Sequence, residues 1–326
     1  MLQLGIIGTG SISHEFIKAA QLSGEYQLTA VYSRTLSAAE RFAQSYQNVA
    51  LYTDMIEFLS AGLDVVYIAS PNSLHFNHAK VAILARKHVI VEKPAVSRPE
   101  EWQELVKLAA EHQVYIFEAA RNYHEAAFTV IRDFLKDKKI WGANFTYAKY
   151  SSKMGALLSG QEPNVFSAKF SGGALMDLGV YTLYAAVRLF GAPQSVCYTA
   201  QQLPNSVDLN GSGSLIYPDF QVRIQAGKNI HSQLPAEIYT NQGTLTLDGI
   251  EFIRSAIFQK LTGETESLAI RQAEHQMLEE AQAFARVLKG DQEELYSDYL
   301  QSATTVHECL FAMRKDAGIR FEVDHD

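Results

Sequence analysis

The sequence predicts an α/β protein built from two parts. Residues 1–121 are expected to form a parallel sheet with helices on both faces, and residues 122–326 an α+β part with a mostly antiparallel, open sheet. Three observations support this prediction. Strand-like and helix-like segments alternate over roughly the first 120 residues, a glycine-rich turn follows the first of them, and later strand-like segments separated by turn residues replace the alternation.

The N-terminal part begins with an apolar segment at residues 2–7, which predicts a strand ending at a glycine. Residues 64–69 are almost continuously apolar, as expected of a strand that is buried on both faces. Ser97 and Glu100 have the spacing of a capping box that opens a helix. Further strands are predicted at 27–32, 49–52, 88–92 and 114–118, and helices after residue 11 and at about 37–46, 75–86 and 97–112.

Repeated β-α-β units make the strands parallel, and such sheets bind ligands at the carboxyl ends of their strands. The loops after residues 7, 32, 69 and 91 are therefore expected to line one crevice.

The C-terminal part has a different rhythm. Turn pairs such as Asn210-Gly211 and Asp248-Gly249 separate its strand-like segments, which predicts an antiparallel sheet with helices on one face. An open sheet of this kind would expose apolar surface, so a homodimer or higher homo-oligomer formed through the sheet is expected. The elements are predicted as a helix at 125–138, a strand at 140–150, a loop at 151–172, a helix at 175–190, strands between 194 and 255, and helices at 272–289 and 296–316.

Composition excludes several classes of partner. The 326 residues carry a formal net charge of -8, which disfavours nucleic acid and anionic membranes but not a small anionic cofactor. The two cysteines, Cys197 and Cys309, support neither a disulfide framework nor a zinc finger. No basic leader with an apolar core precedes the first strand, and no stretch approaches the roughly 20 apolar residues of a membrane span. A cytoplasmic protein is expected.

The turn after the first strand has the pattern Gly-x-Gly-x-x-Ser, from Gly8 to Ser13. In the dinucleotide-binding Rossmann fold, the first glycine makes the tight turn and the second lets the backbone approach the pyrophosphate, at a helix N-terminus that favours anions. The alternative is a plain βα turn in another doubly wound protein. The residues expected to hold the cofactor here are Gly8, Thr9, Gly10, Ser11 and Ile12.

The end of the second strand indicates which dinucleotide binds. An NAD-binding protein usually has an acidic residue there for the ribose 2′-hydroxyl. Here the strand is followed by Ser33 and Arg34, which could hold a 2′-phosphate. NADP(H) is therefore predicted in preference to NAD(H), although Arg34 could also be a solvated surface arginine.

Two further strand ends carry candidate residues. Ser70, Pro71 and Asn72 follow the strand at 64–69 and are expected to pass along the cofactor, with His75 as a wall of the crevice. His75 and His78 have no carboxylate or third histidine near them in sequence, so no metal site is predicted.

The strand at 88–92 ends in Glu92-Lys93-Pro94, which places a lysine at the ligand edge of the sheet and allows a cis bond before the proline. A lysine in that position can transfer protons. By residue type alone, a surface lysine at a strand end is the simpler reading.

These motifs occur in the order in which they are found in the Gfo/Idh/MocA oxidoreductases, and the sequence resembles that family over nearly its whole length. The resemblance rests on the glycine turn, the segment Ser70–His75, the triplet Glu92–Pro94 and the later segment Gly172–Tyr181. It implies that Lys93 contacts both substrate and nicotinamide. The cofactor-binding residues that it adds to the glycine turn are Ser33, Arg34, Ser70, Pro71, Asn72, His75, Glu92 and Lys93.

The resemblance also assigns catalytic roles to Asp177 and Tyr181, which the spacing i, i+4 places on one face of a helix. Tyrosine at position 181 is similar to the branch that contains glucose–fructose oxidoreductase, dimeric dihydrodiol dehydrogenases and NADP-dependent xylose dehydrogenases. The family often has an Arg and then a Pro after the sixth strand, where this chain has Tyr123 and Ala126. Arg121 and Tyr123 are taken as candidate substrate-binding residues.

The expected function is hydride transfer between NADP(H) and a carbinol or carbonyl carbon of a sugar, polyol or diol. Lys93 and Tyr181 would act on the reacting oxygen, with Lys93 as the preferred proton donor, and Asp177 would orient a substrate hydroxyl or the lysine. The alternative is a regulatory protein that has the same fold and binds NADP(H) without turnover.

Overall fold

The structure is a computed structural model that describes residues 1–290 and 292–325. The chain divides into two compact units. The first contains Met1–Ala119 and Glu274–Gln301, and the second contains Ala120–Ala273 together with the chain from Ser302 onward. The predicted division into residues 1–121 and 122–326 has two continuous pieces, whereas the contacts group Glu274–Gln301 with the N-terminal unit.

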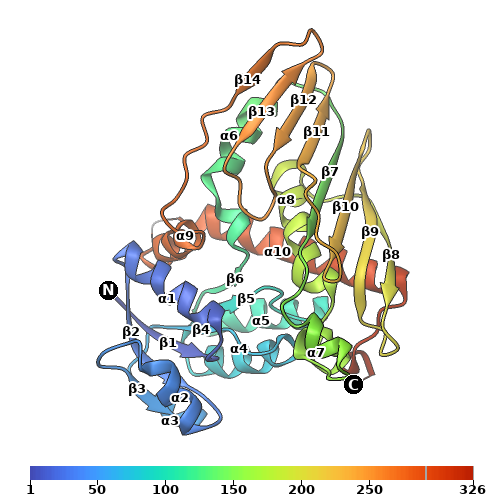
Figure 1. Cartoon of the computed structure of the whole chain (residues 1–326). Helices are drawn as coiled ribbons and strands as arrows, with labels where there is room; N and C mark the ends of the chain where they lie inside the picture. Colours follow the sequence, from blue (N-terminus) through green and yellow to red (C-terminus); the bar gives the residue numbers. More distant parts are fainter. Residues whose placement is uncertain (291, 326) are drawn as a thin grey trace. The chain divides into compact units, whose positions relative to one another are not determined.

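The first unit has a six-stranded sheet in the order β3-β2-β1-β4-β5-β6, and all of its strands are parallel (Figure 1). The order reverses between β1 and β4, which is the switch point at which doubly wound sheets bind ligands. The predicted Rossmann sheet is confirmed. The strands are β1 (Leu2–Ile7), β2 (Tyr26–Tyr32), β3 (Ala50–Tyr52), β4 (Val65–Ile68), β5 (His88–Glu92) and β6 (Ile116–Ala119).

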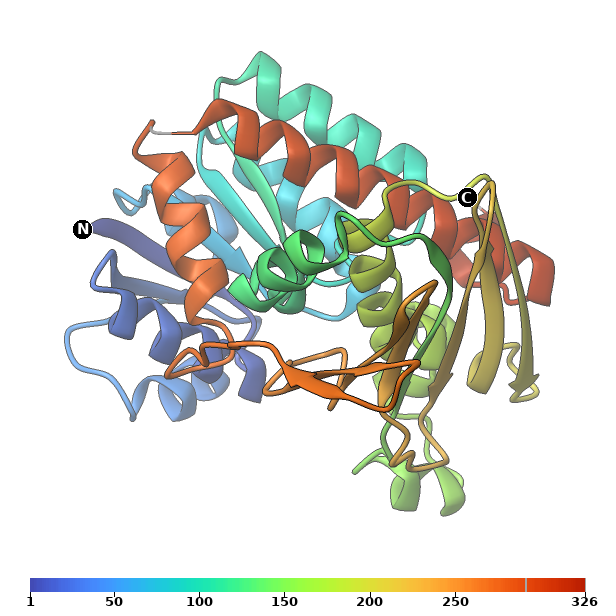
Figure 2. The ribbon, with the colours of Figure 1, turned by 90° about the horizontal axis from the view of Figure 1, so that it is seen from above.

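The helices of the first unit include one that comes from far along the chain. Helix α9 (Leu278–Leu288) packs against α1 (Ser11–Ser23), and Figure 2 shows the two side by side. Phe284 of α9 stacks on Phe117 of β6 with ring centroids 4.7 Å apart, and both belong to one buried core with strands β1 and β4. This apolar contact explains why a late segment joins the first unit. The other helices are α2 (Leu36–Ala43), α3 (Met55–Leu59), α4 (His75–Leu84) and α5 (Pro99–Glu111).

The start of α5 differs by one residue from the predicted capping box. The N-cap is Arg98 rather than Ser97, and the acidic member of the box is Glu101 rather than Glu100. The Glu101 carboxylate accepts hydrogen bonds from the backbone nitrogens of Ser97 and Arg98, both at 3.0 Å. Pro99 occupies the first turn, where a missing N–H costs nothing.

The second unit has an eight-stranded sheet in the order β14-β13-β12-β11-β7-β10-β9-β8. Every neighbouring pair is antiparallel except β7 and β10, which run parallel. The predicted mostly antiparallel sheet is confirmed. The strands are β7 (Ile140–Ala148), β8 (Ser195–Gln202), β9 (Asp208–Ile216), β10 (Gln221–Gly227), β11 (Ala236–Thr240), β12 (Gly243–Leu247), β13 (Ala256–Lys260) and β14 (Thr265–Ser267).

Helix α8 (Val180–Phe190) and the π-helical turn before it, Leu175–Gly179, pack on β7 and β10. The region predicted as a loop at 151–172 contains α7 (Met154–Leu158) and two 3₁₀ turns, Asn164–Phe166 and Ala168–Phe170. The remaining helices are α6 (Ala126–Leu135) and α10 (Glu293–Ala317), whose first residues are grouped with the first unit.

The sequence was expected to contain no stretch that approaches a membrane span, but one helical stretch does. Ala168–Phe190 has the length and composition of a membrane span, with a mean hydropathy of 1.2 in its most apolar window. However, 78% of that window is buried inside the protein, as in the core helix of a soluble protein. Its apolar character is explained by packing on the sheet of the second unit.

Candidate active site

The turn between β1 and α1 requires glycine at position 8. Gly8 has a φ of +107°, and a Cβ atom there would lie 2.4 Å from the carbonyl oxygen of Ala69. Any other side chain would therefore strain the backbone and collide with the end of β4. At Gly10 no atom lies within 4 Å of where a Cβ would be. The second glycine leaves a bare stretch of backbone that a phosphate group can approach closely.

The start of α1 completes this turn. Ser13, in the place of the third glycine of the fingerprint, is fully buried and donates its hydroxyl hydrogen to the carbonyl oxygen of Gly8 at 2.7 Å. Gly10 caps the helix without a side-chain hydrogen bond, and the first turn contains no acidic residue. The N–H groups at the helix start thus suit an anion. Thr9, Ser11 and Ile12 are partly or fully exposed beside it, so the residues present fit a dinucleotide.

The end of β2 presents a positive charge. Arg34 is exposed, and Ser33 before it is partly exposed. The pKa of His78 is lowered by burial and, to a smaller extent, by the charge of Arg34. The Nδ1 atom of His78 lies 2.9 Å from the hydroxyl oxygen of Ser70 after β4. The guanidinium of Arg34 therefore lies near the carboxyl ends of both strands, where the ribose of a dinucleotide is expected.

His75 is buried, with only 1% of its surface exposed. Its Nδ1 lies 2.9 Å from the carbonyl oxygen of Pro94, and its Nε2 lies 2.7 Å from that of Ser70. Burial lowers the pKa of His75 to about 4, so the ring is neutral at pH 7 and donates one hydrogen bond. The structure places His75 as a buried link between the end of β4 and the segment that follows β5.

The segment around Lys93 is fixed by two buried acidic residues. Glu92 accepts a hydrogen bond from the hydroxyl of Tyr67 and, at 3.2 Å, from the backbone nitrogen of Lys93. Glu118 at the end of β6 accepts a hydrogen bond from the backbone nitrogen of Ala95 at 3.1 Å. The Lys93–Pro94 bond is cis, as the sequence allowed, and Lys93 itself is partly exposed. The surrounding hydrogen bonds hold the backbone on both sides of this lysine.

The second unit carries the other predicted catalytic residues. Asp177 lies in the π-helical turn and Tyr181 in the first turn of α8, so the predicted helix has a local widening at this point. Such π turns within α-helices occur frequently at functional sites. Asp177 forms an ion pair with Lys228, a buried residue that directly follows β10. Sequence reasoning missed Lys228, since no motif surrounds it.

Arg121 and Tyr181 lie together. The guanidinium carbon of Arg121 is 5.1 Å from the centre of the Tyr181 ring, a cation–π contact, and its Nη1 donates to the carbonyl oxygen of Glu251 at 2.9 Å. Tyr147 of β7 meets Tyr181 edge to face with ring centroids 5.3 Å apart. This group therefore joins a cation and two phenol rings at the start of α8.

Tyr123 does not belong to this group. It is 4% exposed, and its hydroxyl lies 2.8 Å from the hydroxyl of Ser302. Its ring packs edge to face on Tyr184 and lies beneath the guanidinium of Arg188. These contacts are those of a residue in the helix packing of the second unit.

A buried carboxylate holds the beginning of the π-helical turn. Asp208 at the start of β9 accepts hydrogen bonds from the backbone nitrogen of Leu175 at 2.7 Å and from the Tyr198 hydroxyl at 3.3 Å. A Cβ at Gly173 would lie 2.1 Å from this carboxylate. Burial raises the pKa of Asp208 to about 6. The glycine in the segment Gly172–Tyr181 thus makes room for a carboxylate that sequence reasoning did not identify.

Comparison with known proteins identifies the two domains of this chain. Residues 2–120 match the oxidoreductase family with an NAD-binding Rossmann fold, and residues 139–246 match the GFO/IDH/MocA C-terminal domain. Among solved structures, the 3-ketoreductase KijD10 from Actinomadura kijaniata, in complex with NADP and TDP-benzene, has a TM-score of 0.83 at 21% identity and covers 97% of this chain and 98% of its own. That likeness supports the fold.

Two curated relatives match from end to end. The uncharacterized oxidoreductase YgjR of Escherichia coli is 36% identical over 326 residues, and the scyllo-inositol 2-dehydrogenase (NADP(+)) IolU of Bacillus subtilis is 33% identical over 326 residues. Each alignment covers 99% of this chain and 99% of the relative. With its two matching domains and these full-length relatives, the chain belongs to the Gfo/Idh/MocA family of oxidoreductases.

Proposed function

We propose that this oxidoreductase interconverts a secondary hydroxyl and a ketone of a sugar, polyol or diol with NADP(H), and that cyclic polyols of the inositol type are its substrates. The observation that carries the cofactor part is the exposed Arg34 at the end of β2, where an NAD-binding protein has an acidic residue. The substrate class is supported by the Bacillus subtilis relative, whose name gives scyllo-inositol as substrate and NADP⁺ as cofactor.

Lys93 is the proposed proton donor and acceptor for the reacting oxygen. It is a partly exposed lysine at the ligand edge of the Rossmann sheet, and hydrogen bonds to Glu92 and Glu118 fix the backbone around it. When bound, NADP(H) supplies or accepts the hydride. Lys93 donates a proton to the carbonyl oxygen in reduction and removes it from the hydroxyl in oxidation.

Tyr181 is proposed to polarise the same oxygen, and Asp177 to orient a neighbouring hydroxyl of the substrate. The cation–π contact with Arg121 supports the role of Tyr181, because it holds the phenol ring beside a second polar group that can face the substrate. Arg121 is itself proposed to contact the substrate. For Tyr123, the buried packing among Tyr184 and Ser302 supports a structural role.

The function is tested with the purified protein and a panel of inositols, other polyols, sugars and diols, by following NADPH formation from NADP⁺. Turnover of at least one cyclic polyol is expected. Tight NADPH binding without turnover of any compound would instead favour a regulatory protein that binds the cofactor, and binding of neither NADPH nor NADH would contradict the cofactor assignment.

Replacing Arg34 by Ala should weaken NADPH binding by about 10- to 100-fold, because a charge-assisted hydrogen bond to the 2′-phosphate contributes about 1.5–3 kcal/mol. NADH binding should change little. The measurement is a fluorescence titration with each cofactor. Arg41→Ala, an exposed arginine on α2, is the matched control and should leave both affinities unchanged. An equal loss of NADPH and NADH affinity in Arg34→Ala would remove the proposed role in selecting NADP.

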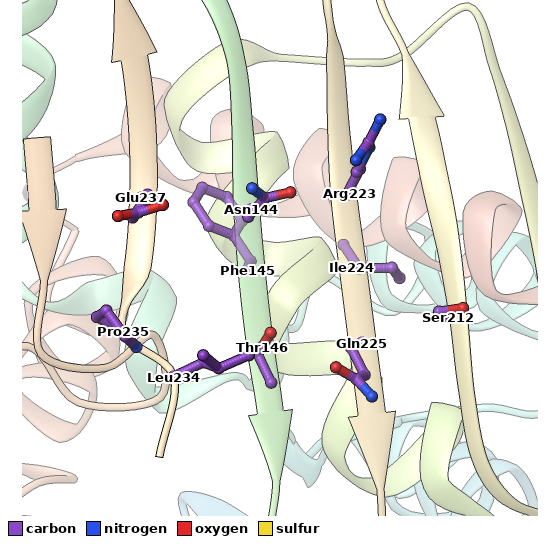
Figure 3. Close-up of a pocket in the computed structure, with 10 residues that line it drawn as sticks. All are labelled: Asn144, Phe145, Thr146, Ser212, Arg223, Ile224, Gln225, Leu234, Pro235 and Glu237. Atoms are coloured by element: carbon purple, nitrogen blue, oxygen red, sulfur yellow. The ribbon is translucent and has the colours of Figure 1, made fainter. Parts of the chain in front are cut away.

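The open face of the second sheet is proposed to form a homodimer. Figure 3 shows a hollow on this face of β7, β9, β10 and β11, where polar side chains and the exposed Leu234 lie together. The residues lining it are Asn144, Phe145, Thr146, Ser212, Arg223, Ile224, Gln225, Leu234, Pro235 and Glu237. Arg223 and Glu237 carry opposite charges, so a two-fold axis could pair each with the other in a second copy.

Reversing one of these charges should weaken the dimer. Glu237→Arg would face the partner's like charge and is expected to raise the dissociation constant at least about 10-fold, whereas adding Arg223→Glu should restore it. Light scattering after size exclusion measures both. Lys107→Glu on α5 of the first unit is the control. A wild-type protein that stays monomeric at all concentrations would exclude this interface.

We also propose the cytoplasm as the location of the protein. Cys197 is an exposed free thiol and Cys309 a buried one. Free thiols of this kind persist in a reducing compartment.

A further inference from the structure

Lys228 is a lysine in a place where lysines are rarely found. Its side chain is 5% exposed. Its backbone is held on both sides, since its nitrogen donates to the carbonyl oxygen of Leu209 at 2.7 Å and its carbonyl oxygen accepts from the nitrogen of Ser151 at 2.8 Å. Fully buried lysines are uncommon unless they are paired. The end of β10 therefore delivers one ammonium group to a defined point inside the second unit.

The ammonium group meets the carboxylate of Asp177. Its Nζ forms the ion pair with Oδ2 of Asp177 and lies 5.8 Å from the centre of the Phe166 ring, which is fully buried. The two partners differ in exposure, because the side chain of Asp177 is 35% exposed. A buried charge next to a partly exposed one can fix the orientation of the exposed group.

This geometry restricts the chemistry of Asp177. The neighbouring ammonium group favours the ionised form of the Asp177 carboxyl, and an ionised carboxylate only accepts hydrogen bonds. A group in that state can hold a substrate hydroxyl but is a poor proton donor. The π-helical turn adds a second constraint, since Asp208 holds its first backbone nitrogen at Leu175. Asp208 therefore restrains the backbone of the turn that carries Asp177, and Lys228 restrains the Asp177 carboxylate itself.

We propose that Lys228 is a positioning residue for the reaction: it holds Asp177 ionised and in one orientation, so that Asp177 accepts a hydrogen bond from a substrate hydroxyl next to the reacting carbon. This inference rests on the proposed function. It narrows the substrates to compounds with a hydroxyl adjacent to the carbon that is oxidised, because the carboxylate accepts a hydrogen bond and repels an anionic neighbour.

The test replaces Lys228 by Met, which keeps the length of the side chain and removes the charge. With the best polyol of the panel, the KM is expected to rise and kcat/KM to fall by about 10²-fold, the size of effect that a small misplacement of a catalytic group can produce. The Kd for NADPH should stay within about twofold. Lys228→Arg keeps the charge and should recover most of the loss. Lys260→Met, at an exposed lysine paired with Glu264, is the control and should have no effect.

A double-mutant cycle separates positioning from structure. If Lys228 acts through Asp177, the pair Lys228→Met with Asp177→Asn should be no less active than Asp177→Asn alone. If the activity losses of the two single variants add in the double variant, the proposal is overturned. It is also overturned if Lys228→Met lowers kcat only in proportion to the amount of folded protein and leaves the polyol KM unchanged. Lys228→Gln, which keeps a donor without the charge, is the second variant, and the double variant leaves no unpaired charge behind. If Lys228→Met, Lys228→Gln and the double variant all misfold, Lys228 has a purely structural role and the proposal is overturned.

Failure of the proposed function gives a different result. In that case the wild-type protein itself oxidises no compound of the panel, and the inference falls with it. Active wild type with an unaffected Lys228→Met variant overturns the inference alone.

Discussion

Lys93→Met should reduce turnover by about 10²–10⁴-fold or more while the affinity for NADPH stays nearly unchanged. Methionine has a similar length but has no proton to give, so the loss corresponds to general acid–base catalysis of the reacting oxygen. The backbone around position 93 is held by Glu92 and Glu118, and these hydrogen bonds do not involve the lysine side chain. The fold and the glycine turn should therefore survive the substitution.

Two measurements decide this prediction, namely single-turnover kinetics with the best polyol and fluorescence titration with NADPH. Lys80→Met on α4 serves as the matched control, because Lys80 is likewise a partly exposed lysine of the same unit and is paired with Glu104. Loss of cofactor binding in parallel with turnover would assign Lys93 to the cofactor rather than to proton transfer. Turnover close to that of the wild type would remove it from the mechanism.

Asp208 should make the second unit less stable as the pH rises from about 4 to about 6. Its pKa is raised by burial from 3.8 to about 6. Between these values the folded state keeps a proton that the unfolded state has lost, so the free energy of unfolding falls with rising pH, by about 3 kcal/mol in total. Above about pH 6 this contribution stays constant at its lower value.

Asp208→Asn isolates this effect, since an amide does not titrate. Relative to the wild type, the variant should gain about 2–3 kcal/mol between pH 4 and pH 7.5, as measured by urea unfolding at each pH. The comparison with the wild type is needed because His75 acts in the opposite direction. Its pKa is lowered to about 4, so its contribution is lost as the pH falls. A difference between variant and wild type that does not change with pH would show that Asp208 is ionised in both states.

The fold of the first unit could be predicted because its signals are local. The apolar segments alternate with helical periodicity, and the glycine turn needs only residues 8–13 to be recognised. At Gly8 the structure adds the reason, a positive φ and a close approach to Ala69. The prediction of NADP(H) from the end of β2 also rests on adjacent residues, because no acidic residue is present there and Arg34 follows the strand.

Other features could not be read from adjacent residues. Helix α9 belongs to the first unit because Phe284 packs on Phe117, a contact between segments far apart in the chain. The composition of the open sheet face is another such feature. The segments were apolar enough to predict strands, but only the pairing of β7, β10 and β11 shows which side chains point inward.

The sequence by itself determined the fold class and the glycine turn, because each is carried by a short run of residues whose periodicity or spacing has a simple physical meaning. The lysine at the end of β5 and the pair of Asp177 and Tyr181 were predicted from the resemblance of their motifs to a family. Only the tertiary structure showed that Lys228 pairs with Asp177 and that Asp208 accepts a hydrogen bond from the backbone nitrogen of Leu175. Asp208 begins β9 and Lys228 directly follows β10, so both come after the helix in sequence, and a buried charge meets its partner through folding rather than through spacing along the chain.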